Sequence, residues 1–246
     1  MLNECGILHR DISTNNILAV SSNSSPNELH GLLIDLDSAV QTDDERKAPA
    51  VRSGTPLFMS IVNVEGLTEE RTALDDWESL LYVICWLATF GITSDDRLIE
   101  IEKSEYPIVL WTTGTAKAAA LAKRTHMDSS RNFETNIADN FQGRYTLLRK
   151  LATNLHKVLF LNEKCLGALR STYTVKESTT KPTSRSKHSD SDSSDDSDLE
   201  EGTVSYVIDP LVERCKHVDN IVEELLGVMD SMKRKAKRYL KKMAAS

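Results

Sequence analysis

Two short apolar runs near the beginning of the chain predict a pair of β-strands. The first covers residues 17–20 and the second covers residues 32–34. The polar stretch 21–27 between them contains a proline, which is typical of a turn. The second run ends on Asp35-Leu36-Asp37. The pattern therefore predicts a two-stranded hairpin with acidic residues at its exit, and the few residues before the first strand resemble the end of a helix.

Longer apolar patterns predict helices in the rest of the chain. Residues 80–92 are apolar on nearly all sides, which indicates a buried central helix, and Asp75-Asp76 before them are typical of an acidic N-cap and first turn. This run is shorter than the roughly 20 residues that a membrane helix needs. Residues 116–122 are rich in alanine, and apolar residues recur at helical spacing over residues 144–160. The expected fold class is therefore mainly α.

Two polar segments interrupt these patterns. Residues 38–55 are charged and have no apolar periodicity, so we expect a mobile segment. Residues 176–202 are rich in Ser and Asp and cannot bury apolar surface, which predicts a disordered acidic linker. A second interpretation is that serines of this linker, each followed closely by an acid, are substrates of an acidophilic kinase: Ser189, Ser191, Ser193 and Ser194.

A long amphipathic helix is predicted within residues 203–246. Its apolar stripe consists of Val218, Ile221, Val222, Leu225, Leu226, Met229, Met232 and Ala236. Its end is basic, with Lys233, Arg234, Lys235, Lys237, Arg238, Lys241 and Lys242. Cations are favourable at a helix C-terminus, which favours a solvated end over nuclear localisation or nucleic-acid contact. The stripe must pack either on the rest of the chain or on a partner helix, over residues 218–240.

Composition sets wider limits on the chain. Its 246 residues are 40% hydrophobic, enough for a sizeable core, and the net charge of −7 argues against a general affinity for nucleic acid or anionic membranes. The four cysteines are far apart and the six histidines form no metal-binding pattern, so neither a disulfide framework nor a zinc site is indicated. The N-terminus does not resemble a signal peptide, so we expect an intracellular protein, cytoplasmic or nuclear.

The residues whose side chains are best suited to catalysis or metal binding precede the first strand. The order His9-Arg10-Asp11-Ile12-Ser13-Thr14-Asn15-Asn16 concentrates charged and amide side chains in one loop. Asp, Ser, Thr and Asn are also ordinary turn residues, so a plain surface turn is the alternative. The predicted hairpin would bring the carboxylate of Asp35 back beside Asp11 and Asn16.

Four motifs in order resemble those of the fungal-type protein kinase family. They are H-R-D-I-S with a following Asn from residue 9, L-I-D-L-D from residue 33, G-T-P-L-F-M from residue 54, and D-D-W-E-S from residue 75. The resemblance is specific over residues 1–90 and extends over residues 91–175 only in helical character. It implies the helical C-lobe of a protein kinase-like fold, with a short β-hairpin at the catalytic cleft.

The resemblance also implies roles for individual residues. Asp11 would accept the proton of the attacking hydroxyl, and Asn16 and Asp35 would hold magnesium and, through it, ATP. Arg10 would bind a phosphate on the activation segment, for which Thr42 and Ser53 are candidates. The resemblance also implies two structural contacts. Thr55 would lie near Asp11, and Asp76 would bind the backbone of the catalytic loop.

Several features of protein kinases in general differ or are missing. Ser13 stands where serine/threonine kinases commonly have lysine, and D-L-D replaces D-F-G, but the fungal-type family shares both of these differences. Ser60-Ile61-Val62 occupy the place of A-P-E, so its glutamate is missing unless Glu65 substitutes for it. No two of the ten glycines are two residues apart and the first lysine is Lys47, so neither a glycine-rich loop nor the strand lysine is found. We therefore expect the N-lobe to be absent and ATP binding to be weak.

The expected organisation is a kinase-like C-lobe over residues 1–175, the linker over 176–202 and the terminal helix over 203–246. The leading hypothesis is ATP- and Mg-dependent phosphoryl transfer to protein Ser or Thr in the complete enzyme. The alternative is a non-catalytic pseudokinase or truncated fragment that binds proteins. A small-molecule phosphotransferase would share the first two motifs, but G-T-P-L-F-M followed by D-D-W-E-S argues against it.

Overall fold

The structure is a computed structural model of the whole chain, and it describes residues 6–22, 25–41, 54–67, 71–91, 105–161, 174–175, 204–205 and 217–243. Several predictions fall outside these residues: the linker over 176–202 with its serines, the first five residues, Thr42 and Ser53. Within the described residues, helices predominate and each β-sheet is a single antiparallel strand pair. A mainly α fold is therefore confirmed. No helix of the described part is long and apolar enough to cross a membrane.

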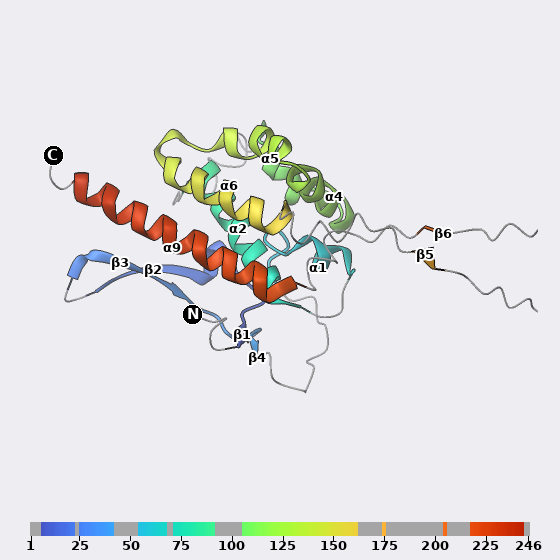
Figure 1. The fold of residues 1–246 in the computed structure, drawn as a ribbon, viewed down its shortest axis with the longest axis horizontal. Coiled ribbons are helices and arrows are strands. Elements are labelled where there is room, and N and C mark those ends of the chain that lie inside the picture. The colour runs from blue at the N-terminus through green and yellow to red at the C-terminus, as the bar shows by residue number, and fades with distance from the viewer. Residues whose placement is uncertain are drawn as a thin grey trace, which may run out of the picture.

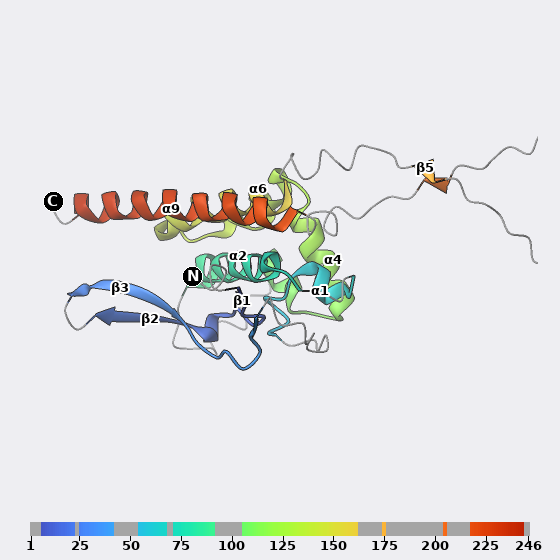
Figure 2. The same ribbon diagram turned by 60° about the horizontal axis from the view of Figure 1, so that its bottom comes forward.

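The predicted hairpin is formed by β2 (Ile17–Ser22) and β3 (Ser25–Leu33). Ile17 pairs with Leu33 and Leu18 with Leu32. The prediction of a long turn over residues 21–27 is wrong, because both strands continue into this polar stretch through backbone pairing, which does not depend on apolar side chains. Figures 1 and 2 show the hairpin extending out below the helices.

A second small sheet joins the residues before the hairpin to residues after it. Ile7–Leu8 form β1, which pairs antiparallel with β4 (Val40–Gln41). For these residues the predicted helix end is wrong, because the two apolar side chains belong to a strand. A third pair, β5 (Thr174–Val175) with β6 (Val204–Ser205), joins residues on the two sides of the predicted linker.

The predicted buried central helix is α2 (Ala73–Phe90). Its N-cap is Thr72, whose side chain accepts a hydrogen bond from the Leu74 amide, and Asp75 bonds back to the Thr72 amide in a capping box. The acidic residues predicted as the cap therefore lie in the first turn. The helix ends at Gly91, whose φ of 76° suits glycine best.

The helix α9 (Val218–Met243) packs on α6 (Thr146–Phe160), and both pack on α2. Figure 2 shows α9 and α6 side by side above α2, with the hairpin on the opposite side of α2. Ile221 and Leu225 of the predicted stripe are buried in the main core with residues of α2 and α6, and Met232 is also buried. The sequence left open whether the stripe packs on the rest of the chain or on a partner helix. In the structure it packs on the rest of the chain.

The remaining described helices complete the core beside α2. They are α1 (Ile61–Glu65), α4 (Ala116–Met127), α5 (Ser130–Asn136) and the 3₁₀ helices η2 (Thr14–Asn16), η4 (Pro107–Trp111), η5 (Ala138–Asn140) and η6 (Gly143–Tyr145). The main core contains Leu81, Tyr82, Trp111, Phe133 and Leu155. The predicted alanine-rich helix is thus confirmed and continues to Met127.

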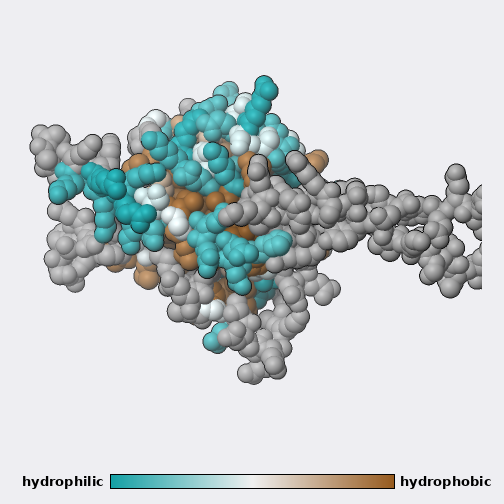
Figure 3. Space-filling model, viewed as in Figure 1, coloured by the Kyte–Doolittle hydropathy of each residue, from teal (hydrophilic) through white to brown (hydrophobic). Residues whose placement is uncertain are grey.

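Hydrophilic side chains gather over the C-terminal half of α9 (Figure 3). The exposed cations of this basic surface are Lys233, Arg234, Lys235, Lys237, Arg238 and Lys241. Because the apolar stripe faces α6 and α2, the cations are left on the solvent side, as the amphipathic pattern predicts.

Candidate functional site

The loop that carries Asp11 is anchored to the first turn of α2. The buried carboxylate of Asp76 accepts hydrogen bonds from the backbone amides of His9, at 2.7 Å, and Arg10, at 2.9 Å. Arg10 has a φ of 69°, a conformation that non-glycine residues rarely adopt. Burial raises the pKa of Asp76, and the two amides oppose this rise. The predicted contact between Asp76 and the catalytic-loop backbone is therefore confirmed.

The same loop is bound to the end of the hairpin. The buried imidazole of His9 donates from Nε2 to the carbonyl oxygen of Ile34 at 2.9 Å. The Ile34 amide donates to the carbonyl oxygen of Asn16, also at 2.9 Å. These bonds fix the backbone immediately before Asp35, which has a φ of 63°. The hairpin thus returns Asp35 to the loop, as its strand order predicts.

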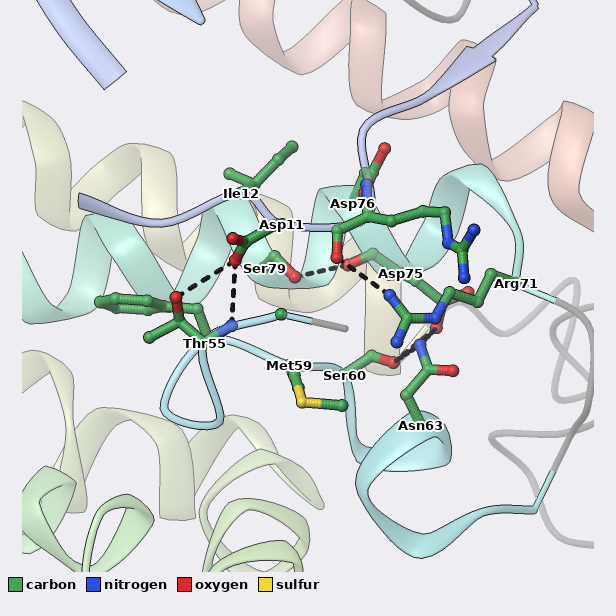
Figure 4. A pocket seen from close by; sticks show the side chains of 13 residues that line it. Asp11, Ile12, Thr55, Met59, Ser60, Asn63, Arg71, Asp75, Asp76 and Ser79 are labelled. Carbon is green, nitrogen blue, oxygen red and sulfur yellow. Dashed lines mark hydrogen bonds between the residues drawn. The ribbon is translucent and has the colours of Figure 1, made fainter. Parts of the chain in front are cut away.

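The carboxylate of Asp11 is oriented from both sides. Its Oδ1 accepts hydrogen bonds from the amide of Thr55, at 2.9 Å, and from the hydroxyl of Thr55, at 3.1 Å (Figure 4). The Asn16 amide nitrogen Nδ2 donates to Asp11 Oδ2 at 3.2 Å and to the Asp11 carbonyl oxygen at 2.9 Å. The predicted proximity of Thr55 to Asp11 is confirmed. A half-buried carboxylate held in this way has one fixed orientation.

The same contacts suit the predicted magnesium ligands. Because Nδ2 of Asn16 is the atom that binds Asp11, the other amide atom, the oxygen Oδ1, remains for a cation. Asp35 is exposed and follows directly on the residue that pairs with Asn16. Two oxygen donors match what Mg²⁺ takes from a protein when phosphate oxygens complete its shell. Among the described residues, no cluster of three or more His, Cys, Asp or Glu offers a competing metal site.

Two arginines lie together at the other side of the loop. Arg71 Nη1 donates to the carbonyl oxygen of Arg10 at 2.9 Å. The pKa of Arg71 is lowered, first by burial and then by the positive charge of Arg10, while Asp75 and Asp76 oppose this. Arg10 Nε is buried and makes no hydrogen bond with any described residue. Figure 4 shows Arg71 in the small cavity beside Asp75 and Asp76. Arg71 was not predicted from the sequence. Its position directly before Thr72, the N-cap of α2, is the sequence signal that could have indicated it.

The turn that carries Thr55 begins at a glycine that no other residue can replace without strain. Gly54 has a φ of 126°, and a Cβ atom there would lie 3.2 Å from the Arg10 carbonyl oxygen and 3.3 Å from Met59 Cγ. The turn therefore approaches the loop of residues 9–16 closely because residue 54 has no side chain.

Two carboxylates of α2 fix the chain that follows this turn. Asp75 Oδ1 accepts from the Ser60 hydroxyl at 2.5 Å and from Asn63 Nδ2 at 2.8 Å. Glu78, which is 0% exposed, accepts from the Ile61 amide at 2.7 Å and from the Tyr82 hydroxyl at 2.6 Å. Glu78 was not predicted as a positioning residue, since its sequence position suits an ordinary first helical turn equally well.

Residues of α4 complete the surroundings of the turn. The buried ammonium group of Lys123 donates to the carbonyl oxygens of Met59, at 2.6 Å, and Pro56, at 3.2 Å. The neighbouring Arg124 donates from Nε to Glu65 Oε1 at 3.2 Å and forms an ion pair with it. Glu65 of α1 is thus bound to α4. The helical periodicity of this part of the sequence does not indicate that Lys123 or Arg124 contacts the site.

These contacts join all four motifs in one place, and a comparison with known families agrees with them. Residues 1–88 match the model of the family described as fungal protein kinase. Residues 1–88 are therefore similar to this family, which is the family that the motifs indicate. It covers about a third of the chain and ends within α2. None of the curated proteins matches the chain.

Proposed function

We propose that this chain carries the catalytic loop of a protein kinase and, in the complete enzyme, transfers the terminal phosphoryl group of ATP to a protein Ser or Thr hydroxyl. The observation that supports this most strongly is the Asp11 carboxylate, held by Thr55 on one oxygen and by Asn16 on the other. The helices around α2 would be the C-lobe of a kinase-like fold, with the hairpin at its cleft. A turn without chemistry would not require such a network.

Asp11 is the proposed proton acceptor. As the substrate hydroxyl oxygen bonds to the γ-phosphorus, its proton passes to Asp11, and the bond from the γ-phosphorus to the β,γ-bridging oxygen breaks to release ADP. Asn16, through Oδ1, and Asp35 are the proposed ligands for magnesium, which would neutralise charge on the phosphates when bound. Thr55 keeps the carboxylate of Asp11 turned toward the substrate hydroxyl.

The exposed face of the hairpin favours a nucleotide next to these ligands. Leu18, Val20 and Leu32 are 43%, 42% and 50% exposed. Leu18 and Leu32 are paired across the hairpin, and Leu18 lies two residues beyond Asn16. Such an apolar surface suits the flat face of a purine base, whose phosphates would then point toward the loop.

The two neighbouring arginines support the proposed role of Arg10 in binding an activation-segment phosphate. Two guanidinium groups at one place repel each other and are stabilised by an anion between them. Arg10 Nε is buried without a partner among the described residues, so it retains a donor for phosphate oxygens. Thr42 and Ser53 remain the candidate positions from the sequence.

The direct test is phosphoryl transfer by the full 246-residue chain from radiolabelled ATP to protein substrates in Mg²⁺. Loss of a general base typically costs a factor of about 10²–10⁴, so Asp11→Asn should lower the rate by at least about 100-fold. Asp37→Asn is a matched control, because Asp37 is an exposed acid near the same site. If the wild-type chain transfers phosphate, an equal rate in the Asp11→Asn chain would exclude Asp11 as the base. No transfer by the wild-type chain would favour the non-catalytic candidate below.

A second candidate function is a non-catalytic module that binds proteins. The observation in its favour is the basic surface of α9, which is exposed and has no role in phosphoryl transfer. An acidic protein segment would fit this surface. Calorimetry with ATP, with and without Mg²⁺, separates the two candidates, since the module predicts no metal-dependent nucleotide binding.

A further inference from the structure

Lys123 is a cation enclosed in the protein core. Its side chain is 0% exposed, and Nζ lies 4.6 Å from the centroid of the Tyr82 ring and 6.0 Å from that of Trp111. Burying an ammonium group is costly unless hydrogen-bond partners replace its water. A methionine or leucine would fill the same space without this cost. The position of the charge therefore calls for an explanation beyond packing.

The partners of this charge lie on one turn. Lys123 Nζ donates to the carbonyl oxygens of Met59, at 2.6 Å, and Pro56, at 3.2 Å. Both residues belong to the turn over residues 54–60. Charge-assisted bonds of this kind are about twice as strong as neutral ones. Lys123 thus attaches α4 to the backbone of this turn.

The turn transmits this attachment to Asp11. The amide of Met59 donates to the Thr55 carbonyl oxygen at 3.1 Å, and Thr55 in turn donates to the Asp11 carboxylate. Met59 is therefore bonded to Lys123 through its carbonyl group and to Thr55 through its amide group. A short chain of hydrogen bonds leads from α4 to the carboxylate of the catalytic loop.

The residue that follows the turn, Ile61, is held by α2. Glu78 accepts hydrogen bonds from the Ile61 amide and from the Tyr82 hydroxyl, whose ring Lys123 covers. The negative charge of Glu78 also stabilises the protonated form of Lys123. With the Ile61 end fixed, a change at Lys123 should affect the part of the turn nearest Thr55.

We infer that Lys123 is a positioning residue that holds the Thr55 turn against Asp11 and so couples α4 to the catalytic loop. This inference goes beyond the proposed phosphoryl transfer and does not depend on it. It is tested on the chain without nucleotide, so that its failure would leave the activity test unaffected.

The test is amide hydrogen exchange, followed by NMR in the full chain with Lys123→Met. Methionine keeps most of the apolar stem and removes the charge. If Lys123 is a positioning residue, the Thr55 amide should exchange at least 10-fold faster, while the β2–β3 hairpin and α6 are unchanged. If Lys123 only stabilises the core, faster exchange will be uniform over the molecule. Uniform or unchanged exchange would overturn the inference. Lys117→Met, at an exposed position of the same helix, is the matched control.

A measurement on the wild-type chain covers the case in which Lys123→Met does not fold. Burial lowers the pKa of Lys123 to about 7, so the group loses its charge as the pH rises from 6 to 9. The protection of the Thr55 amide, relative to the hairpin, should then fall over this range. The other titratable groups near Lys123 are Glu78, Tyr82 and His126, and burial lowers the pKa of His126, which favours its neutral form. Constant relative protection would contradict the inference.

Discussion

Asp76 offers the most quantitative test of how the loop of residues 9–16 is held. Its buried carboxylate accepts the His9 amide at 2.7 Å and the Arg10 amide at 2.9 Å. Asp76→Ala leaves both buried donors without an acceptor. A hydrogen bond to a charged group contributes about 1.5–3 kcal/mol, so losing both should lower the free energy of unfolding by roughly 3–6 kcal/mol. Asp76→Asn keeps one acceptor oxygen, and its cost should be about half as large.

The loss should also appear in the loop itself. Arg10 has a φ of 69°, which costs on the order of 1–2 kcal/mol and persists only while neighbouring bonds enforce it. Urea denaturation of the full chain measures the total effect, and amide exchange at His9 and Arg10 measures the local one. Asp230→Ala, at an exposed position of α9, should change stability by less than about 0.5 kcal/mol. The reasoning is refuted if Asp76→Ala costs less than about 1 kcal/mol, or if exchange at these two amides is unaltered.

Three further predictions concern single residues. Gly54→Ala should lower the free energy of unfolding by about 1–3 kcal/mol, measured by urea denaturation, because φ is 126° and the Arg10 carbonyl lies 3.2 Å from the new Cβ. Thr55→Val removes the hydroxyl bond to Asp11 but keeps the amide bond, and should cost about 1 kcal/mol in the same measurement. Burial lowers the pKa of His156 from 6.5 to about 4. The unfolded chain therefore binds this proton first as the pH falls, and stability should drop by up to about 3 kcal/mol between pH 6.5 and pH 4.

Each of these predictions has its own control. Gly143→Ala tests the glycine argument, because a Cβ there meets no atom within 4 Å, and it should cost much less than Gly54→Ala. Thr55→Ser keeps both bonds to Asp11 and should be nearly neutral. In His156→Gln the pH dependence attributed to His156 should disappear, and an unchanged acid transition in this variant would assign the transition to other groups.

The sequence predicted the features that depend on local pattern or on motif order. The buried helix α2 follows from its apolar run, and the hairpin follows from two short runs with acids at the exit. The contacts of Asp76 and Thr55 followed from the family resemblance. Both kinds of inference use residues close together in the sequence or in a fixed order, and the structure confirms them.

Sequence reasoning missed the residues whose roles depend on tertiary packing. Lys123 looks like an ordinary charge beyond an alanine-rich stretch, and it becomes significant only where α4 meets the turn after Gly54. Glu78 resembles an acid of the first helical turn, yet it binds the amide of Ile61. The true N-cap of α2, Thr72, was also missed, because Asp75-Asp76 offered a plausible cap three residues later. Periodicity identifies buried faces, and it does not indicate which backbone groups will need a partner there.

The proposed function depends most directly on whether Asn16 and Asp35 bind a divalent cation together with nucleotide. NMR of the full chain with Mn²⁺ in place of Mg²⁺ tests this, because the paramagnetic ion broadens signals of nearby residues even when binding is weak. With ATP present, we predict broadening at Asn16 and Asp35 that Asp35→Asn abolishes. Broadening confined to the acidic stretch of residues 190–201, or equal broadening in Asp35→Asn, would contradict a phosphoryl-transfer site at this loop.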